Sequence, residues 1–205
     1  MASSHISPEF QKISFGSFRV EGRPACVLRA YESAQFYSHN FDVLRLRRQN
    51  SMALLGPSGA GKTHLLVAVS NALLSQGIGV HYFPWVEGSG DLRDAVKGHG
   101  DSVTRLLGAL KNSDVLYVDD LYKGRKEPTE FQLEFLFDVV NFRYLNQLPI
   151  LVSSERDIEG LCEVDEAIGS RIYEMCSHFL INMRLTDGEQ TEGMNLNYRL
   201  GQREA

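Results

Sequence analysis

The chain has 205 residues, of which 43% are hydrophobic and 23% are charged, and its formal net charge is −5. This length and composition fit one globular domain with a sizeable core, and the negative charge argues against nonspecific affinity for nucleic acid over the whole surface. There is no transmembrane-length apolar run, no signal-peptide core and no C-x-x-C pair among the three cysteines. We therefore expect a cytoplasmic protein with reduced thiols, without a zinc site and without a membrane partner.

The N-terminal residues divide into a start that we set aside and a first pair of elements. Residues 1–5 resemble a cloning remnant, so we treat residues 1–10 as an appended or disordered start and predict a single domain over 11–205. Within that domain, residues 13–20 read as a short strand or loop and residues 26–37 as a helix.

The most informative stretch is Gly56-Pro-Ser-Gly-Ala-Gly-Lys-Thr63, which matches the pattern G-x-x-x-x-G-K-[ST]. Residues 51–55 before it predict a buried strand, and residues 64–74 after it predict a helix. In that setting the glycines let backbone N–H groups converge on phosphates, Lys62 adds a charge, and the Thr63 hydroxyl can ligate Mg²⁺. The candidate nucleotide-binding residues are Gly56, Pro57, Ser58, Gly59, Ala60, Gly61, Lys62, Thr63 and His64.

Further along the chain, strands alternate with helices. The predicted strands are 80–83, 115–118, 150–152 and 179–181, and the predicted helices are 91–97 (a short piece), 102–111, 129–146 and 166–176. Together with the strand before the phosphate loop, this order predicts an α/β fold: a five-stranded parallel sheet covered on both faces, as in the three-layer core of P-loop NTPases.

Acidic and polar residues follow two of these strands. Asp119 and Asp120 end the third strand, at the edge where the phosphate loop also lies in such sheets. We expect Asp119 to act on the metal side, with Thr63, and Asp120 to polarise the attacking water. Ser154 and Glu155 end the fourth strand and can reach the γ-phosphate or that water; a serine that caps a helix is an equally good interpretation.

Arg171 lies on an otherwise semi-apolar helix. It could reach the γ-phosphate of a neighbouring subunit, as an arginine finger does, although by its chemistry alone a salt bridge to Glu174 or Asp165 is the simpler expectation. Two basic clusters, 45–48 and 123–126, read as solvated faces or as local DNA contacts.

These residues, in this order, resemble the AAA+ ATPases and, more narrowly, the bacterial replicative helicase loaders of the DnaC/DnaI type, with relatives among replication initiators and IstB-like transposition helper proteins. The resemblance covers about residues 51–201 and rests on 56–63, 118–121, 141–144, 148–155, 165–176 and 197–200. It implies a Walker B pair at Asp119 and Asp120, a sensor I region at Ser154 and Glu155, and an arginine finger at Arg171.

The same resemblance implies that segment 91–97 is an extra helix used in assembly and DNA contact. Only a short stretch follows the fifth predicted strand, too little for the usual C-terminal helical lid, and loaders of this type also lack that lid. Arg143 is our second choice for an arginine that crosses a subunit interface. With Lys62 of the loop and four residues from these assignments, the expected catalytic set is Asp120, Lys62, Arg171, Ser154 and Glu155. Asp120 is one methylene shorter than the glutamate usual at that position, which implies slow hydrolysis that partners stimulate.

The resulting functional expectation is an ATPase, with ATP and Mg²⁺ as cofactors, that associates with itself through Arg171 and helps place the replicative hexameric helicase on single-stranded DNA during replication initiation. The alternatives are an ATP-dependent transposition helper that binds duplex DNA, a small-molecule kinase, and a nucleotide-binding module that does not turn over. The kinase is the weaker alternative, because no arginine-bearing lid follows the fifth predicted strand.

Overall fold

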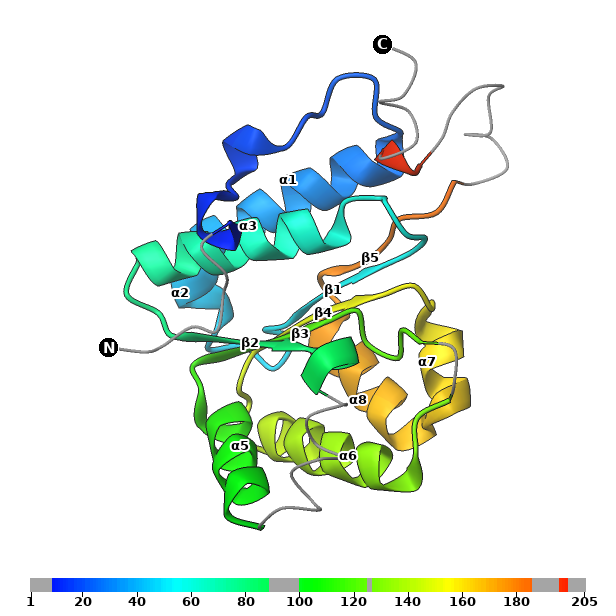
Figure 1. Cartoon of the computed structure of the whole chain (residues 1–205). Coiled ribbons are helices and arrows are strands. Elements are labelled where there is room, and N and C mark those ends of the chain that lie inside the picture. The colour runs from blue at the N-terminus through cyan, green and yellow to red at the C-terminus, as the bar shows by residue number, and fades with distance from the viewer. Residues whose placement is uncertain (1–8, 89–99, 125–126, 186–195, 199–205) are drawn as a thin grey trace.

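Five parallel strands form the centre of the molecule, in the order β2-β3-β4-β1-β5 (Figure 1). The computed structural model describes residues 9–88, 100–124, 127–185 and 196–198. The strands are β1 Met52–Leu55, β2 Val80–Pro84, β3 Val115–Asp119, β4 Ile150–Ser154 and β5 Leu180–Asn182. Every neighbouring pair runs parallel, and β4 lies between β3 and β1. Because the strands are parallel and adjacent, the carboxyl ends of β1, β3 and β4 lie side by side at one edge of the sheet.

Helices cover both faces of the sheet, so the molecule has three layers (Figure 1). On one face lie α1 Ala25–His39, α2 Phe41–Leu44 and α3 Lys62–Ser75; on the other lie α5 Gly100–Asn112, α6 Glu130–Leu145, α7 Ile158–Val164 and α8 Glu166–Cys176. Two short 3₁₀ turns, Phe10–Lys12 and Phe15–Ser17, precede α1. The α/β fold with a five-stranded parallel sheet is therefore confirmed.

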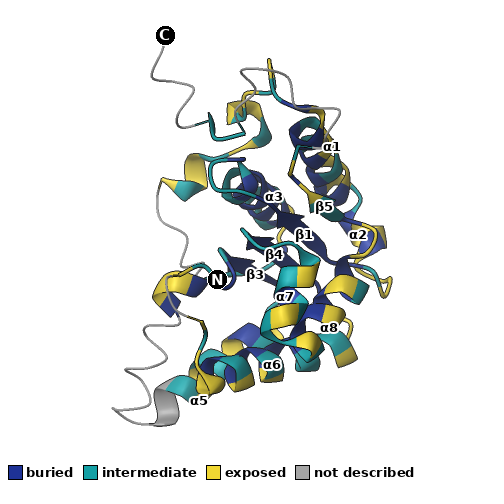
Figure 2. Ribbon diagram, turned by 90° about the vertical axis from the view of Figure 1, so that its right-hand side faces the viewer, coloured by how far each residue is buried: buried dark blue, intermediate teal, exposed yellow. Residues whose placement is uncertain are grey.

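The sheet is buried because apolar side chains leave each central strand on both sides. Leu54 packs with α1 and α3, while Leu55 packs with the helices of the opposite layer, and Tyr117 and Val118 alternate in the same way on β3. Figure 2 shows the strands as an almost continuous buried layer between the helices. Continuous apolar runs of this kind are typical of parallel strands covered on both faces.

Local capping explains where several helices begin. The Thr129 hydroxyl accepts a hydrogen bond from the Gln132 backbone N–H, which completes a capping box at the start of α6. Asp157 caps α7 through the Gly160 N–H, and Asp165 caps α8 through the Ile168 N–H. The two aspartate caps thus determine where α7 and α8 begin after β4.

The predicted helices and strands that fall within the described residues are found, with ends that differ by a few residues. Of the two interpretations of residues 13–20, the loop is the correct one: they contain a 3₁₀ turn and extended backbone but no strand. The helices α2 and α7 were not predicted, since each is short and buries few side chains. The predicted helical piece 91–97 and most of the residues after β5, where a lid would lie, fall outside the described residues. Among the described residues, no helix combines the length and apolar character that crossing a bilayer requires.

Candidate nucleotide-binding site

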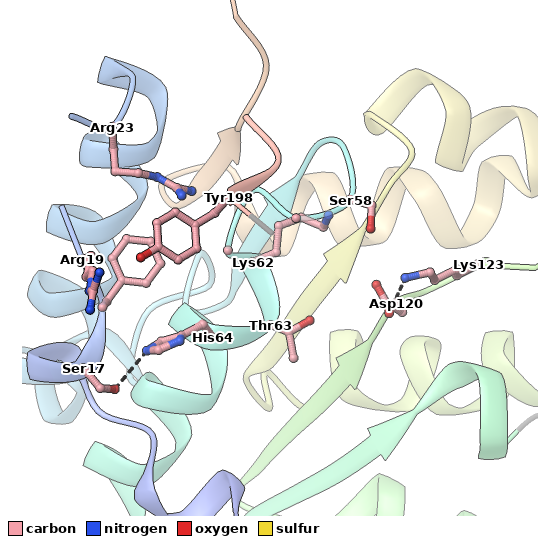
Figure 3. Close-up of a pocket in the computed structure, with 13 residues that line it drawn as sticks. Ser17, Arg19, Arg23, Ser58, Lys62, Thr63, His64, Asp120, Lys123 and Tyr198 are labelled. Carbon is pink, nitrogen blue, oxygen red and sulfur yellow. Dashed lines mark hydrogen bonds and ion pairs between the residues drawn. The ribbon is translucent and has the colours of Figure 1, made fainter. Parts of the chain in front are cut away.

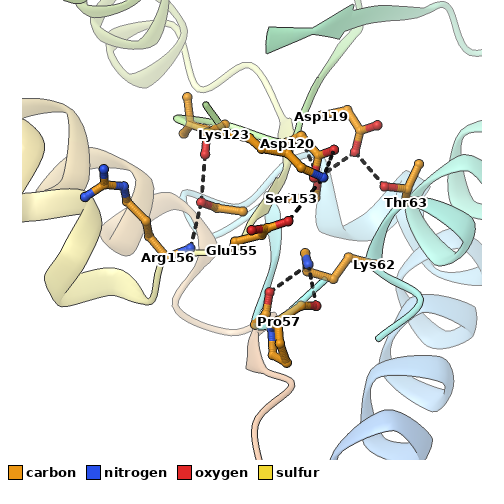
Figure 4. A network of polar contacts seen from close by, with 12 residues as sticks. Pro57, Lys62, Thr63, Asp119, Asp120, Lys123, Ser153, Glu155 and Arg156 are labelled. Atoms are coloured by element: carbon orange, nitrogen blue, oxygen red, sulfur yellow. Dashed lines mark hydrogen bonds and ion pairs between the residues drawn. The ribbon is translucent and has the colours of Figure 1, made fainter. Parts of the chain in front are cut away.

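The phosphate loop and the first aspartate meet at the carboxyl edge of the sheet. The loop leaves β1 and leads into α3, which begins at Lys62, and Asp119 is the last residue of β3. The Thr63 hydroxyl donates to Asp119 Oδ1 over 3.0 Å (Figure 4). The expected proximity of the glycine-rich loop to the aspartates is therefore confirmed, with a hydroxyl and a carboxylate oxygen in the kind of pairing that suits Mg²⁺.

The loop itself encloses the lysine. The Lys62 ammonium donates to the backbone oxygens of Gly56 (2.7 Å) and Pro57 (2.9 Å), and the residue is only 4% exposed. Burial lowers the pKa of Lys62, and the negative charges of Asp120 and Glu155 oppose that shift. A cation held inside a ring of backbone groups at a helix N-terminus is an arrangement that can receive phosphate oxygens.

Gly61 shows why the loop needs glycine. Its φ is +105°, in the left-handed region, and an added Cβ would lie 2.7 Å from the Phe18 ring. A side chain here would both strain the backbone and push against the segment that precedes α1.

Asp119 is held by hydroxyl groups from three strands and one helix. Besides Thr63, its Oδ1 accepts from Tyr117 at 2.6 Å and from Ser153 at 2.5 Å, while Oδ2 accepts from Tyr82 at 3.0 Å. Burial, and then the negative charge of Asp119, raise the pKa values of Tyr82 and Tyr117 well above the ordinary value, so both phenols stay protonated donors. The carboxylate is therefore fixed in one orientation.

Asp120 points toward a different partner. Its backbone φ is +53° and its N–H donates to the Ser153 hydroxyl over 2.7 Å. Its carboxylate pairs with the Lys123 ammonium at 2.9 Å, and the same ammonium lies 3.1 Å from Glu155 (Figure 4). Asp120 and Glu155, two of the predicted catalytic residues, thus share one lysine that sequence reasoning had placed in a basic surface cluster.

A cavity of about 360 Å³ opens beside the loop. One end is polar and the other is aromatic and basic (Figure 3). The lining residues are Ser17, Phe18, Arg19, Arg23, Ser58, Gly59, Gly61, Lys62, Thr63, His64, Asp120, Lys123 and Tyr198.

The aromatic end of this cavity is built by His64, a predicted site residue, and by three residues that sequence reasoning missed: Phe18, Arg23 and Tyr198. Arg23 donates to the Ala60 carbonyl over 2.7 Å, and its guanidinium carbon lies 5.7 Å from the Phe18 ring centre and 5.0 Å from that of Tyr198. His64 packs edge-on against Phe18 at 5.2 Å. Nothing in the spacing of Phe18 and Arg23 identifies them, because only the path of the chain before α1 brings them to the loop.

Comparisons with known proteins agree with this geometry. A model of the family described as IstB-like ATP binding protein matches residues 40–169, well over half of the chain. The chain belongs to the IstB-like ATP-binding family.

Individual relatives of this IstB-like protein are found in Bacillus subtilis and Escherichia coli. It is 43% identical over 205 residues to the uncharacterized protein YqaM of Bacillus subtilis and 44% identical over 185 residues to the phage-like element PBSX protein XkdC of the same organism. It is 26% identical over 171 residues to the replicative helicase loader DnaC of Escherichia coli. These alignments cover 98%, 88% and 83% of the chain, but only 62%, 68% and 65% of the respective relatives.

Solved structures show the same AAA+ P-loop fold. The DnaI crystal structure superposes with a TM-score of 0.70 at 19% identity and covers 87% of this chain and 95% of that one. The replication initiator DnaA bound to AMPPCP and single-stranded DNA superposes with a TM-score of 0.68 at 22% identity, over 91% of this chain and 53% of that one.

In this IstB-like domain the two serines that end β4 have separate environments. The Ser154 hydroxyl donates to the Leu121 carbonyl over 2.8 Å and accepts from the Arg156 N–H, so it lies outside the cavity lining. Ser153 is the serine that contacts both aspartates. The alternative interpretation of Ser154 as a helix cap is wrong, because Asp157 caps α7.

Arg171 packs within its own subunit and outside the cavity lining. Its Nε donates to Asn141 Oδ1 over 3.0 Å, its Nη1 donates to the Ala167 carbonyl over 2.8 Å, and its guanidinium lies over the rings of Phe137 and Tyr144. The simpler expectation of a salt bridge to Glu174 or Asp165 is wrong. Glu174 pairs instead with Arg48, from the basic cluster 45–48, at 2.5 Å, and Asp165 caps α8.

Arg143 cannot cross an interface, so its selection as the second candidate was wrong. It is fully buried, and its two terminal nitrogens donate to backbone carbonyls at 2.7 to 3.3 Å. The carbonyls belong to Leu110, Lys111, Ser113, Asp114 and Pro149. Burial lowers the pKa of Arg143 to about 9, which leaves it protonated at neutral pH. It joins α6 to the connections that enter β3 and β4.

Proposed function

We propose that this IstB-like protein binds and slowly hydrolyses Mg²⁺-ATP and uses that cycle as a switch. The observation that carries the proposal is the 3.0 Å contact between the Thr63 hydroxyl and Asp119, beside the enclosed Lys62. These two oxygen groups would hold Mg²⁺, which neutralises phosphate charge and orients the terminal phosphate when bound. Lys62 and the N-terminal N–H groups of α3 would bind the phosphates.

The remaining groups at this edge suit hydrolysis. Asp120 would orient the attacking water and accept its proton, and the rigid Asp119 network would keep the metal side in place while it does so. Glu155 stays a sensor I candidate through its shared contact with Lys123. The Ser154 hydroxyl donates to the Leu121 carbonyl, so only the backbone of Ser154 could take part in a sensor I role. The aromatic end of the cavity would receive the base between Phe18 and Tyr198.

We further propose that the client is the replicative hexameric helicase, which the protein would help to place on single-stranded DNA. Two comparisons support this: the similar E. coli protein is named a replicative helicase loader, and a solved structure of the DnaC helicase loader has the same fold. Arg171 would act on a neighbouring subunit's nucleotide, which fits its position outside its own cavity. Assembly would then depend on the triphosphate.

The test measures nucleotide binding and assembly separately. Lys62→Ala and Asp119→Asn should abolish Mg²⁺-ATP binding in a titration, while Asp120→Asn should bind ATP but release no phosphate. Arg171→Ala should bind ATP normally but lose ATP-dependent association with itself and with the helicase. Arg105→Ala, an exposed arginine on α5, is the matched control. A protein that binds ATP yet never associates with the helicase would contradict the loader role.

A transposition helper is the second candidate, favoured by the family match itself. In that case the client would be a transposase, and duplex DNA would bind more tightly than single-stranded DNA, with affinity that falls steeply as salt rises. Comparing both DNA forms at two salt concentrations, with and without ATP, distinguishes the two roles.

A further inference from the structure

Lys123 lies at the end of the cavity that the nucleotide base would not occupy. Along the cavity, the aromatic end with Tyr198 comes first, Lys62 and Thr63 lie in the middle, and Asp120 and Lys123 lie at the far end (Figure 3). A nucleotide with its base at the aromatic end and its phosphates on Lys62 would therefore extend its last phosphate toward Lys123.

The backbone that carries Lys123 is fixed. Its N–H donates to the Asp120 carbonyl over 2.9 Å, and the Leu121 N–H donates to the Ser153 carbonyl over 2.8 Å. Asp120 and Tyr122 both have positive φ, and the buried Tyr122 ring packs edge-on against Trp85 at 5.4 Å. Two non-glycine residues in the left-handed region within three positions form a costly turn, of the kind that persists where surrounding contacts hold a functional group in place.

The side chain of Lys123 has donor capacity for a phosphate. An ammonium group has three N–H donors, and two of them are directed at Asp120 (2.9 Å) and Glu155 (3.1 Å). The Lys123 side chain is still 36% exposed and lines the cavity. The third donor is therefore available to an oxygen that enters the cavity.

The charges at this end of the cavity make a contact with Lys123 more important for binding a triphosphate than for binding a diphosphate. Asp119, Asp120 and Glu155 would together repel the terminal phosphate, and Lys123 is the cation placed between two of them. Without the Lys123 charge, the carboxylates would still repel the γ-phosphate. The α- and β-phosphates would be less affected, because they would remain bound to Lys62.

We propose that Lys123 binds the γ-phosphate from within the same subunit and makes the site prefer ATP over ADP. The inference rests on the proposed nucleotide function and extends it, because it separates recognition of the triphosphate from the Arg171 contact of a neighbour. Lys123 is then a substrate-binding residue and not a DNA contact.

The experiment compares two affinities in the same protein. Binding of ADP and of a non-hydrolysable β,γ-methylene ATP analogue, each with Mg²⁺, is measured by calorimetry for the wild type and Lys123→Met. The analogue should lose roughly tenfold or more in affinity, the scale of one charge-assisted hydrogen bond, while ADP changes less than about twofold. Unchanged ADP binding also shows that the variant is folded, and Lys123→Arg should restore much of the preference.

Lys111→Met is the matched control, since Lys111 also pairs with a carboxylate, Asp138 at 2.6 Å, but does not line the cavity. If Lys123→Met lost affinity equally for ADP and for the analogue, or bound the analogue more tightly, the inference would be wrong. Tighter analogue binding would mean that Lys123 only keeps the Asp120 carboxylate away from the nucleotide. If the wild type binds neither ligand, the proposed nucleotide function itself fails.

Discussion

Ser153 and Asp119 share a hydrogen bond of 2.5 Å, and the same Ser153 hydroxyl accepts the N–H of Asp120 at 2.7 Å. One side chain on β4 therefore fixes both the last residue of β3, Asp119, and the aspartate that follows it, Asp120. The adjacent Ser154 is equally buried but bonds to the Leu121 carbonyl instead.

Ser153→Ala should weaken Mg²⁺-dependent ATP binding more than Ser154→Ala does. The change removes a donor from Asp119 and leaves the Asp120 N–H without its partner, so it should also lower the free energy of unfolding by about 1–3 kcal/mol. The measurement is a nucleotide titration over a range of Mg²⁺ concentrations together with urea unfolding. If Ser154→Ala shifts the Mg²⁺ requirement as much as Ser153→Ala, the positioning role assigned to Ser153 is wrong.

Arg143→Leu should act on stability and not on assembly. Its guanidinium donates to five backbone carbonyls, all inside the protein. Leaving these acceptors buried without donors should cost about 3 kcal/mol or more. Thermal unfolding measures the loss, and Arg171→Leu serves as the comparison. A fully stable Arg143→Leu protein that no longer assembles would show that the buried position is incorrect.

Gly169→Ala should destabilise the α7–α8 pair that carries Arg171. A Cβ at Gly169 would lie 2.6 Å from the Cys162 sulfur and 2.8 Å from its backbone nitrogen. Because backbone cannot move aside cheaply, we expect a loss of about 1–3 kcal/mol in unfolding free energy. Gly108 on α5 has open space around its Cβ position, so Gly108→Ala should stabilise the protein by up to about 1 kcal/mol. Equal effects at both glycines would contradict the packing.

His64 should make stability fall at mildly acidic pH. Burial lowers the pKa of His64 below 6.5, the ordinary value, while the backbone of Ser14 partly opposes the shift. The folded protein therefore binds this proton more weakly than the unfolded chain does. The stability that neutral His64 contributes is fully present above the pKa of His64 in the unfolded chain. It is lost as pH falls through the lower pKa of His64 in the folded protein. Urea unfolding at pH 7.5 and 5.5 should show a smaller loss for His64→Gln than for the wild type; identical losses would argue against it.

Local sequence determined most of the helices and strands, the glycine-rich motif at 56–63 and the acidic pair Asp119 and Asp120. The run Gly56 to Thr63 is readable because the glycines that take positive φ and the lysine that follows them are neighbours in the chain. The strand that ends at Asp119 is readable for a similar reason: an uninterrupted apolar run is typical of a strand buried on both faces. A parallel sheet places the ends of these strands at one edge, and the spatial order β3-β4-β1 then brings the aspartates and the loop together there.

Only the tertiary structure decided which side chains complete the site. Ser153 rather than Ser154 reaches the aspartates because successive residues of a strand point to opposite sides, and the register against β3 selects one of them. Phe18, Arg23 and Tyr198 reach the cavity through long-range chain paths, and Arg143 is buried because α6 packs against the turn before β3. Such contacts join residues far apart in sequence, so no local pattern encodes them.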